Sequence, residues 1–363
     1  MSFHLYIAQA TSLDQSQGQF SALQPLHHSL QSRQGLTLLG CLLLVGVFSM
    51  LGRRKKGKLA TSHFGRNQEK STARKRGWQQ IKTPKKNAVC LYTTQPQRQS
   101  DAKPIYLPDA QRGIAVCGGP GSGKTFSIID PLIRSSLNQG FPTIIYDFKY
   151  PNQSSRHAAY AARLGYKVRV FAPGFPESDV CNPLDFLRDE TDAEMARQIA
   201  TVMNKNFRLL GTQNTQDSFF AAAGDQLTEA LLMLTKGTPY PDIITAQAIL
   251  GLTDLGNRVA TAAQAKKLNP WTQVSFNQLI GVKDAEKTVS GIVGTASDVF
   301  TRFMKAGVLG AFCGQTSLPL DLDGQELIIF GMDRQRRSVV GPLVATIMHM
   351  IVTRNVTRPR ERP

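Results

Sequence analysis

The sequence lacks the cysteine and histidine patterns that mark zinc sites and disulfide-stapled folds. Its cysteines are odd in number, widely scattered and nowhere at C-x-x-C spacing: Cys41, Cys90, Cys117, Cys181 and Cys313. The histidines His63, His157 and His349 likewise have no partner at ligand spacing. The pattern therefore indicates neither a zinc site nor a disulfide framework, and it suits a reducing cytoplasm for the soluble part of the chain.

Acidic residues are nearly missing between residues 53 and 86, where thirteen Lys or Arg stand against Glu69 alone. This segment carries twelve of the seventeen net positive charges of the 363-residue chain. Because the rest is close to neutral, the overall basicity does not predict a nucleic-acid surface over the whole protein. The low apolar content predicts a flexible basic linker over residues 53–87, which either touches anionic lipid or contacts DNA.

Long apolar runs are also scarce, and the one at residues 36–51 has no charge and extends to 35–52 with its flanking glycines. Eighteen helical residues span about 27 Å, close to the thickness of a bilayer core. A signal peptide is disfavoured because a long polar segment precedes the run and basic residues follow it, and a buried core helix is the other alternative. We expect a transmembrane helix at 35–52, with residues 1–34 outside and the remainder in the cytoplasm by the positive-inside rule.

The most informative segment that the chain does contain is a glycine-rich loop with the pattern G-x-x-x-x-G-K-[ST]. The loop consists of Gly118, Gly119, Pro120, Gly121, Ser122, Gly123, Lys124 and Thr125. A strand-like run at 113–117 precedes it and a helical pattern at 126–138 follows, which is the context of a phosphate-binding loop. Loop amides and the helix N-terminus would surround a polyphosphate, Lys124 would reach the β- and γ-phosphates as the catalytic cation, and Thr125 would hold Mg²⁺. A nucleoside triphosphate is the expected ligand, and a merely connecting turn is the alternative.

From residue 88 onward, strand and helix patterns alternate as they do around a parallel α/β sheet. Strands are predicted at 113–117, 143–147, 167–171 and 326–331, and helices at 126–138, 154–164 and 339–355. Between the last two strands, further helical patterns cover 193–207, 218–235, 242–255, 257–267 and 286–304, and the first of them follows the capping box Thr191–Glu194. We expect an α/β nucleotide-binding domain split over residues 88–185 and 321–363, with an inserted all-α domain at 186–320.

Four features together resemble the type IV coupling proteins, the TraG/TraD group of conjugative DNA-transfer ATPases. They are the loop Gly118–Thr125, Pro131 in the helix after it, the D-x-K pattern at Asp147–Lys149 and the N-P-L-D pattern at Asn182–Asp185. The resemblance implies a RecA-like motor, anchored in the bacterial inner membrane and hexameric, that uses ATP and Mg²⁺. It also implies that the partners are DNA or a relaxase–DNA complex and the components of a type IV secretion channel.

The chain departs from this group in the acidic residues that hydrolysis needs. A motor requires an apolar strand that ends in an acid for Mg²⁺, with a second carboxylate to activate water. The candidates Asp147 and Asp333 each follow an apolar run, but neither is followed by a second acid. In the group, the Asp-Glu strand lies beyond the helix that ends here near Asn355, so we expect a truncated or split motor, or a nucleotide-binding membrane adaptor without turnover. Three arginines, Arg334, Arg336 and Arg337, either contact phosphate or DNA or form a solvated turn.

The topology of the predicted anchor can be tested with reporter fusions. A reporter fused at residue 5 should be exported, and one fused after Lys86 should stay in the cytoplasm, because the basic cluster follows the apolar run. Alkaline phosphatase and green fluorescent protein activities measure the two locations. The opposite pattern, or cytoplasmic location of both fusions, would contradict the predicted orientation.

Overall fold

A computed structural model of the chain describes residues 37, 44–45, 64–85, 88–101, 103–210 and 218–358. The chain divides into two compact units, Met1–Arg66 and Asn67–Pro363. The predicted outer segment at 1–34 and the predicted transmembrane helix at 35–52 lie outside the described residues, apart from Thr37, Leu44 and Val45, which are helical. The described strands and the glycine-rich loop all belong to the second unit.

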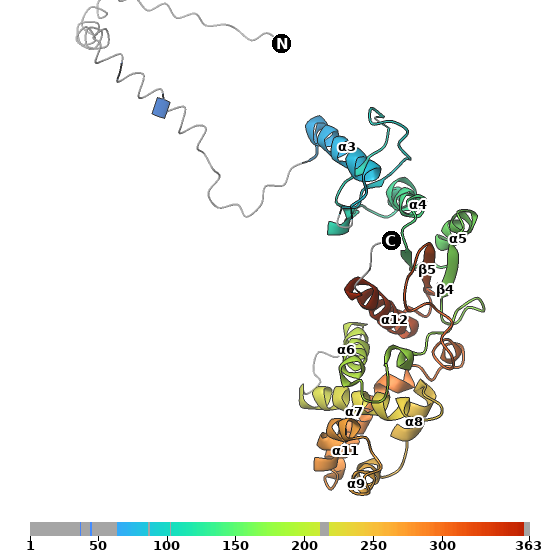
Figure 1. Cartoon of the computed structure of the whole chain (residues 1–363). Coiled ribbons are helices and arrows are strands. Elements are labelled where there is room, and N and C mark those ends of the chain that lie inside the picture. Colours follow the sequence, from blue (N-terminus) through green and yellow to red (C-terminus); the bar gives the residue numbers. More distant parts are fainter. Residues whose placement is uncertain are drawn as a thin grey trace, which may run out of the picture. The chain divides into compact units, whose positions relative to one another are not determined.

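Helices and strands of the second unit can be followed from blue to dark red in Figure 1. The strands are β1 (Leu91–Tyr92), β2 (Tyr106–Leu107), β3 (Thr143–Asp147), β4 (Lys167–Phe171) and β5 (Glu326–Gly331). The α-helices are α3 (Asn67–Lys82), α4 (Asp130–Asn138), α5 (Ser154–Arg163), α6 (Ala193–Leu210), α7 (Ser218–Lys236), α8 (Ile243–Leu250), α9 (Leu255–Gln264), α10 (Pro270–Gly281), α11 (Glu286–Thr301) and α12 (Arg337–Thr357). Shorter turns are η1 (Ala110–Arg112), the π-helix η2 (Thr125–Ile129), η3 (Pro183–Phe186) and η4 (Leu309–Ala311).

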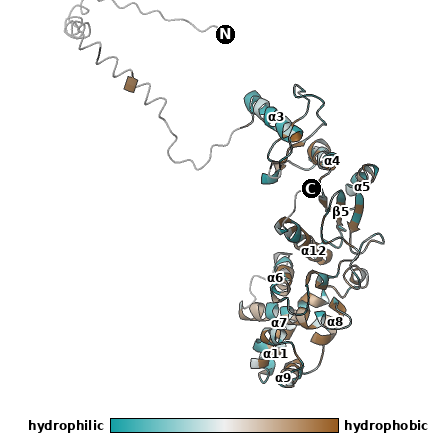
Figure 2. Cartoon of the chain, viewed as in Figure 1, coloured by the Kyte–Doolittle hydropathy of each residue, from teal (hydrophilic) through white to brown (hydrophobic). Residues whose placement is uncertain are grey.

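β5 is the central strand of a three-stranded parallel sheet with the order β3-β5-β4. Its side chains alternate between two cores: Leu327 and Ile329 pack with residues of α4 and α5, whereas Ile328 and Phe330 pack with residues of α12 and of the helical segment α6–α11. β5 is apolar from Leu327 to Phe330 and largely hydrophobic in Figure 2, which suits burial on both faces. The predicted α/β class, with helices on both faces of a parallel sheet, is confirmed.

The run at 113–117 is not a strand, although its apolar composition predicts one. Among the described strands, β3 and β4 each pair with β5, and no ladder includes this run. Its residues are mostly exposed, and Ile114 keeps 39% of its surface open to solvent. A strand needs a partner for its backbone hydrogen bonds as well as apolar side chains. The prediction of a strand before the loop is therefore wrong.

α7 is the centre of the helical segment, because it packs against α6, α8, α10 and α11. α10 is missing from the predicted helices, although Asn269 caps its first turn and Pro270 occupies its first position, a combination typical of helix starts. The predicted capping box is not formed, since Asp192 rather than Thr191 accepts the amide of Met195, at 3.4 Å, and Met195 has no side-chain oxygen to return the bond. The domain boundaries predicted at residues 88, 186 and 321 fall inside the second unit and remain predictions.

The N-P-L-D segment Asn182–Asp185 ties the helical segment to the chain around the sheet. The buried Asn182 side chain donates to Pro241 O at 2.8 Å, just before α8. Asp185 accepts a hydrogen bond of 2.6 Å from the hydroxyl of Thr316, in the segment that leads to β5. These contacts join parts of the chain more than fifty residues apart, so the motif positions the elements of the fold.

The second half of the predicted flexible linker is the helix α3, so the prediction of flexibility is wrong for residues 67–82. The helix packs against β2, and Gly77 is buried so closely that a Cβ there would lie 2.9 Å from the sulfur of Cys90. The Asp109 carboxylate accepts a hydrogen bond of 2.8 Å from Gln80 and pairs with Arg76 at 2.7 Å. Tertiary contacts therefore stabilise a helix whose composition is that of a solvated linker.

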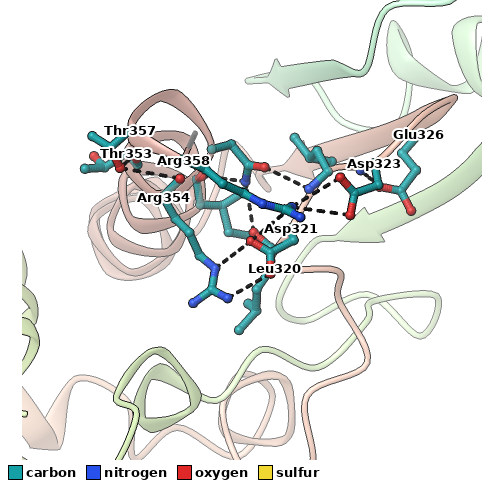
Figure 3. Close-up of polar contacts among 11 residues, drawn as sticks. Leu320, Asp321, Asp323, Glu326, Thr353, Arg354, Thr357 and Arg358 are labelled. Atoms are coloured by element: carbon teal, nitrogen blue, oxygen red, sulfur yellow. Dashed lines mark hydrogen bonds and ion pairs between the residues drawn. The ribbon is translucent and has the colours of Figure 1, made fainter. Parts of the chain in front are cut away.

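α12 is long and apolar enough to cross a membrane by length and composition, but 56% of its most apolar stretch is buried in the second unit. It packs against α6 and β5. Near its end, Arg354 donates two hydrogen bonds of 2.8 Å to Asp321, and Arg358 pairs with Asp323 at 3.2 Å (Figure 3). The hydrogen bonds from Arg354 lower the pKa of Asp321. We conclude that α12 is a core helix whose end is held to the segment before β5.

Core packing on α12 can be tested with two substitutions on the same helix. Ile347→Ala should lower the free energy of unfolding by about 2–5 kcal/mol, because it leaves a cavity at a side chain that is 1% exposed. Val356→Ala, at a side chain that is 78% exposed, should change it by less than about 0.5 kcal/mol. Urea unfolding of both variants measures the difference. Equal effects would contradict the assignment of α12 as a core helix.

Candidate functional site

The glycine-rich loop Gly118–Thr125 leads directly into the π-helix η2 and then into α4. Gly121 and Gly123 adopt φ values of 74° and 77°, in the left-handed region that glycine reaches without strain. The amide of Ser122 donates to Gly119 O at 3.3 Å and closes a tight turn inside the loop. In the part of the chain that the structure describes, the amides of Gly121, Gly123, Lys124 and Thr125 donate no backbone hydrogen bond. They are therefore available to an anion at the helix N-terminus.

The ammonium group of Lys124 folds back over the same loop. It donates hydrogen bonds of 2.7 Å to both Gly118 O and Gly119 O, and it lies 3.4 Å from the hydroxyl of Ser122. The residues of the loop are exposed, and Lys124 itself is half-buried. The lysine charge, the free amides and the hydroxyl of Ser122 thus belong to one short, mostly exposed loop that ends at Thr125. This donor set fits the oxygens of a polyphosphate.

The helix after the loop changes its winding at the position of Pro131. Residues Thr125–Ile129 are π-helical, and the amide of Asp130 donates to Thr125 O across the wider turn. Pro131 is the second residue of α4, but η2 runs straight into α4, so the missing amide hydrogen removes one bond to the preceding turn. The change from π- to α-helix therefore coincides with this proline. Single π-turns often occur at functional sites.

Neither candidate for the hydrolytic acid is a free carboxylate at the end of its strand. Asp147 is buried, and its two oxygens accept the amides of Lys149 at 2.8 Å and Ser154 at 2.9 Å. Asp333 accepts the amide of Gln335 at 2.9 Å and lies 3.7 Å from the guanidinium of Arg336. Asp147 therefore caps α5, and Asp333 shapes the turn before α12. Both carboxylates thus hold the backbone of the segments that follow their strands.

The three arginines follow β5 at the carboxyl edge of the sheet, where ligands of parallel α/β folds commonly bind. Arg334 is exposed, and Arg337 lies over the ring of Phe148, 5.9 Å from its centre. Arg336 borders a pocket of about 400 Å³ whose walls include Gly174 and Gly307. A Cβ at Gly174 would come within 3.0 Å of the Arg336 guanidinium. The structure thus brings Arg336 to a recess with exposed backbone and leaves Arg334 in solvent.

Two polar clusters near this edge have no clear sequence signal, because their members lie more than twenty residues apart. Asp130, on the helix that follows the loop, accepts hydrogen bonds from Arg156 at 3.1 Å and lies 3.0 Å from the buried His157 ring. These contacts join α4 to α5. After β3, Tyr150 donates a hydrogen bond of 2.6 Å to Glu177, and burial together with that carboxylate raises the pKa of the Tyr150 hydroxyl.

Comparison with known proteins gives one family match and several distant structural matches. The family model described as type IV secretory system conjugative DNA transfer matches residues 66–353. The plasmid coupling protein TrwB in complex with ADP and Mg²⁺ is 15% identical, with a TM-score of 0.45, over 67% of this chain and 52% of that one. An unbound monoclinic form of the conjugative coupling protein TrwBdeltaN70 is 13% identical, with a TM-score of 0.43. This match covers 67% of this chain and 51% of that one. No curated protein matches the chain.

The chain spans about half the length of these solved structures. At such low TM-scores the assignment depends on the family model, which covers more than half of the chain. Its description agrees with the resemblance seen in the loop, in Asp147–Lys149 and in Asn182–Asp185. The chain belongs to the type IV secretory system conjugative DNA transfer family.

Proposed function

We propose that this chain binds ATP and Mg²⁺ at the loop Gly118–Thr125 and acts as a membrane-anchored motor of conjugative transfer. The observation that carries the proposal is the convergence of the Lys124 ammonium and four free amides at the start of one helix. Membership of the conjugative DNA transfer family supports DNA, or a relaxase–DNA complex, as the cargo. Bound nucleotide would supply the free energy for moving that cargo.

Each part of the loop has a separate task in this proposal. The amides of Gly121, Gly123 and Lys124 would hold phosphate oxygens without losing any internal hydrogen bond. On nucleotide binding, the Lys124 ammonium would release the carbonyl oxygens of Gly118 and Gly119 and donate instead to oxygens of the β- and γ-phosphates. Its positive charge would there offset the negative charge of the γ-phosphate. The hydroxyl of Thr125 would serve as a ligand of Mg²⁺, whose charge would offset that of the phosphates.

A nucleotide-binding adaptor without turnover is the second candidate function. It is favoured by the engagement of both Asp147 oxygens with backbone amides, which leaves that carboxylate unsuited to activating water. In that case the chain would bind ATP and recruit DNA-transfer partners to the membrane without releasing phosphate.

The family and the sequence together support a proposal for the wider assembly. We propose a single-pass inner-membrane protein, with residues 1–34 outside, the anchor at 35–52 and the nucleotide-binding body in the cytoplasm. In this arrangement a RecA-like domain at 88–185 and 321–363 carries an inserted helical domain at 186–320, and six copies form a ring at a type IV secretion channel. Arg334, Arg336 and Arg337 would contact phosphate or DNA at the carboxyl edge of the sheet.

Nucleotide binding is tested by removing the lysine of the loop. Lys124→Ala should weaken ATP binding about 10- to 100-fold, since it removes a charged hydrogen-bond donor from the phosphates. Lys287→Ala, which removes the same charge from an exposed position of α11, should leave binding unchanged. Titration with a fluorescent ATP analogue in the presence of Mg²⁺ measures both affinities. Retained affinity in Lys124→Ala would contradict the assigned site.

Turnover separates the motor from the adaptor. If the chain is a motor, the purified protein should release phosphate from ATP, and single-stranded DNA should change the rate. If it is an adaptor, it should bind ATP but release phosphate no faster than Lys124→Ala does. A coupled phosphate-release assay on both proteins, with and without DNA, distinguishes these outcomes.

A further inference from the structure

A groove of about 690 Å³ runs along the exposed face of α3, outside the glycine-rich loop and the sheet edge. Lys75, Trp78 and Lys82 line it along one row of the helix, since positions three, four and seven apart share a face. The rest of the wall consists of Arg76 and of polar uncharged side chains: Thr72, Gln79, Thr83 and, from the loop before β2, Gln99. Positive charge, an aromatic ring and hydrogen-bonding groups therefore meet in one concave surface.

The opposite side of α3 is held firmly, so the groove is preformed. Gly77 packs against Cys90 and Tyr106, and a Cβ there would come within 3.1 Å of Tyr106. Gln80 donates a hydrogen bond of 2.8 Å to the Asp109 carboxylate, and Arg76, which also lines the groove, pairs with that carboxylate at 2.7 Å. Because a rigid site loses less conformational entropy on binding than a mobile one, this packing favours ligand binding at the exposed face.

The charges of the groove are placed at a spacing that suits a polyanion. Lys75 and Lys82 are exposed and form no ion pair with any residue that the structure describes, whereas Arg76 shares its charge with Asp109. Seven residues of helix separate the two lysines by about 10 Å along the axis, which corresponds to about three stacked nucleotides of one strand. Two phosphates of a single strand can therefore meet both ammonium groups.

Trp78 lies between the two lysines and is half-buried in the wall of the groove. An indole face flanked by cations is the arrangement on which single-stranded nucleic acids stack a base while their phosphates are neutralised. Anionic lipid is less suited to this surface, because the groove face of α3 carries no apolar side chain besides Trp78 and the helix is largely hydrophilic in Figure 2.

We propose that the groove around Lys75, Trp78 and Lys82 binds a segment of single-stranded nucleic acid, with one base stacked on Trp78. The inference deepens the proposed transfer function, on which it rests, by naming a contact site for the DNA. The site is distinct from the loop Gly118–Thr125, so the two proposals can fail separately.

The chain contains two tryptophans, Trp78 and Trp271, which allows a direct optical test. In the full-length Trp271→Phe variant, Trp78 is the single tryptophan reporter. Titration with a 15-residue oligothymidine should quench its emission saturably.

The double substitution Lys75→Ala/Lys82→Ala in the same background tests the charges of the groove. It should weaken oligonucleotide binding by about tenfold and reduce the slope of log affinity against log salt concentration by about 1.4. Lys266→Ala/Lys267→Ala, which removes two exposed charges after α9, should match the parent.

Further measurements distinguish nucleic-acid binding in the groove from lipid binding and from the nucleotide site. Absence of quenching, or an unchanged salt slope in the Lys75/Lys82 variant with circular dichroism intact, would overturn the groove proposal. The proposal would also be overturned if the Trp78 emission changed with phosphatidylglycerol nanodiscs, compared with phosphatidylcholine nanodiscs, but did not change with the oligonucleotide. That result would assign the groove to anionic lipid. Lys124→Ala should retain the quenching. If ATP binding is absent while the oligonucleotide still quenches Trp78, the nucleotide proposal fails and the groove proposal stands.

Discussion

The burial of β5 on both of its faces is the constraint on which the rest of the second unit depends. Leu327 and Ile329 join the core beneath α4 and α5, while Ile328 and Phe330 join the core of α12 and the helical segment. Burying such side chains removes apolar surface from water, at roughly 25 cal/mol per Å². The helices on the two faces of the sheet therefore pack against one strand. Asp333 and the three arginines follow the carboxyl end of that strand.

Several polar residues that resemble catalytic candidates are used instead to hold this arrangement. Asp147 caps α5, and Asn182 and Asp185 tie the helical segment to the chain before β5. Buried polar groups are costly unless they are hydrogen-bonded, and each of these side chains has its partners. The chemistry that remains accessible lies in the glycine-rich loop, whose glycines are exposed and whose lysine bonds only to atoms of the loop.

Much of the fold could be predicted from the sequence where local pattern and tertiary environment agree. β3, β4 and β5 have the predicted bounds because each is a short run with strong β-formers at a buried or half-buried site. The run at 113–117 has a similar composition but no ladder partner in the described residues, so composition alone misleads there. α3 shows the reverse case, in which a polar sequence becomes a helix because Gly77 fits closely against Cys90 and Tyr106. The contact of Asp130 with His157 could not be read from spacing, since the sheet brings the two helices together.

The sequence by itself determined the pattern of the phosphate-binding loop, the family to which the chain belongs and the separation of its charge into one basic segment, because these depend on residue types at fixed spacing. Only the tertiary structure decided that Asp147 and Asn182 serve the scaffold, that α12 is a core helix, and that Lys75, Trp78 and Lys82 share an outward-facing groove. The physical reason is that burial and hydrogen-bond partnership arise from segments distant in the chain, and the same side chain is reactive or structural according to those neighbours.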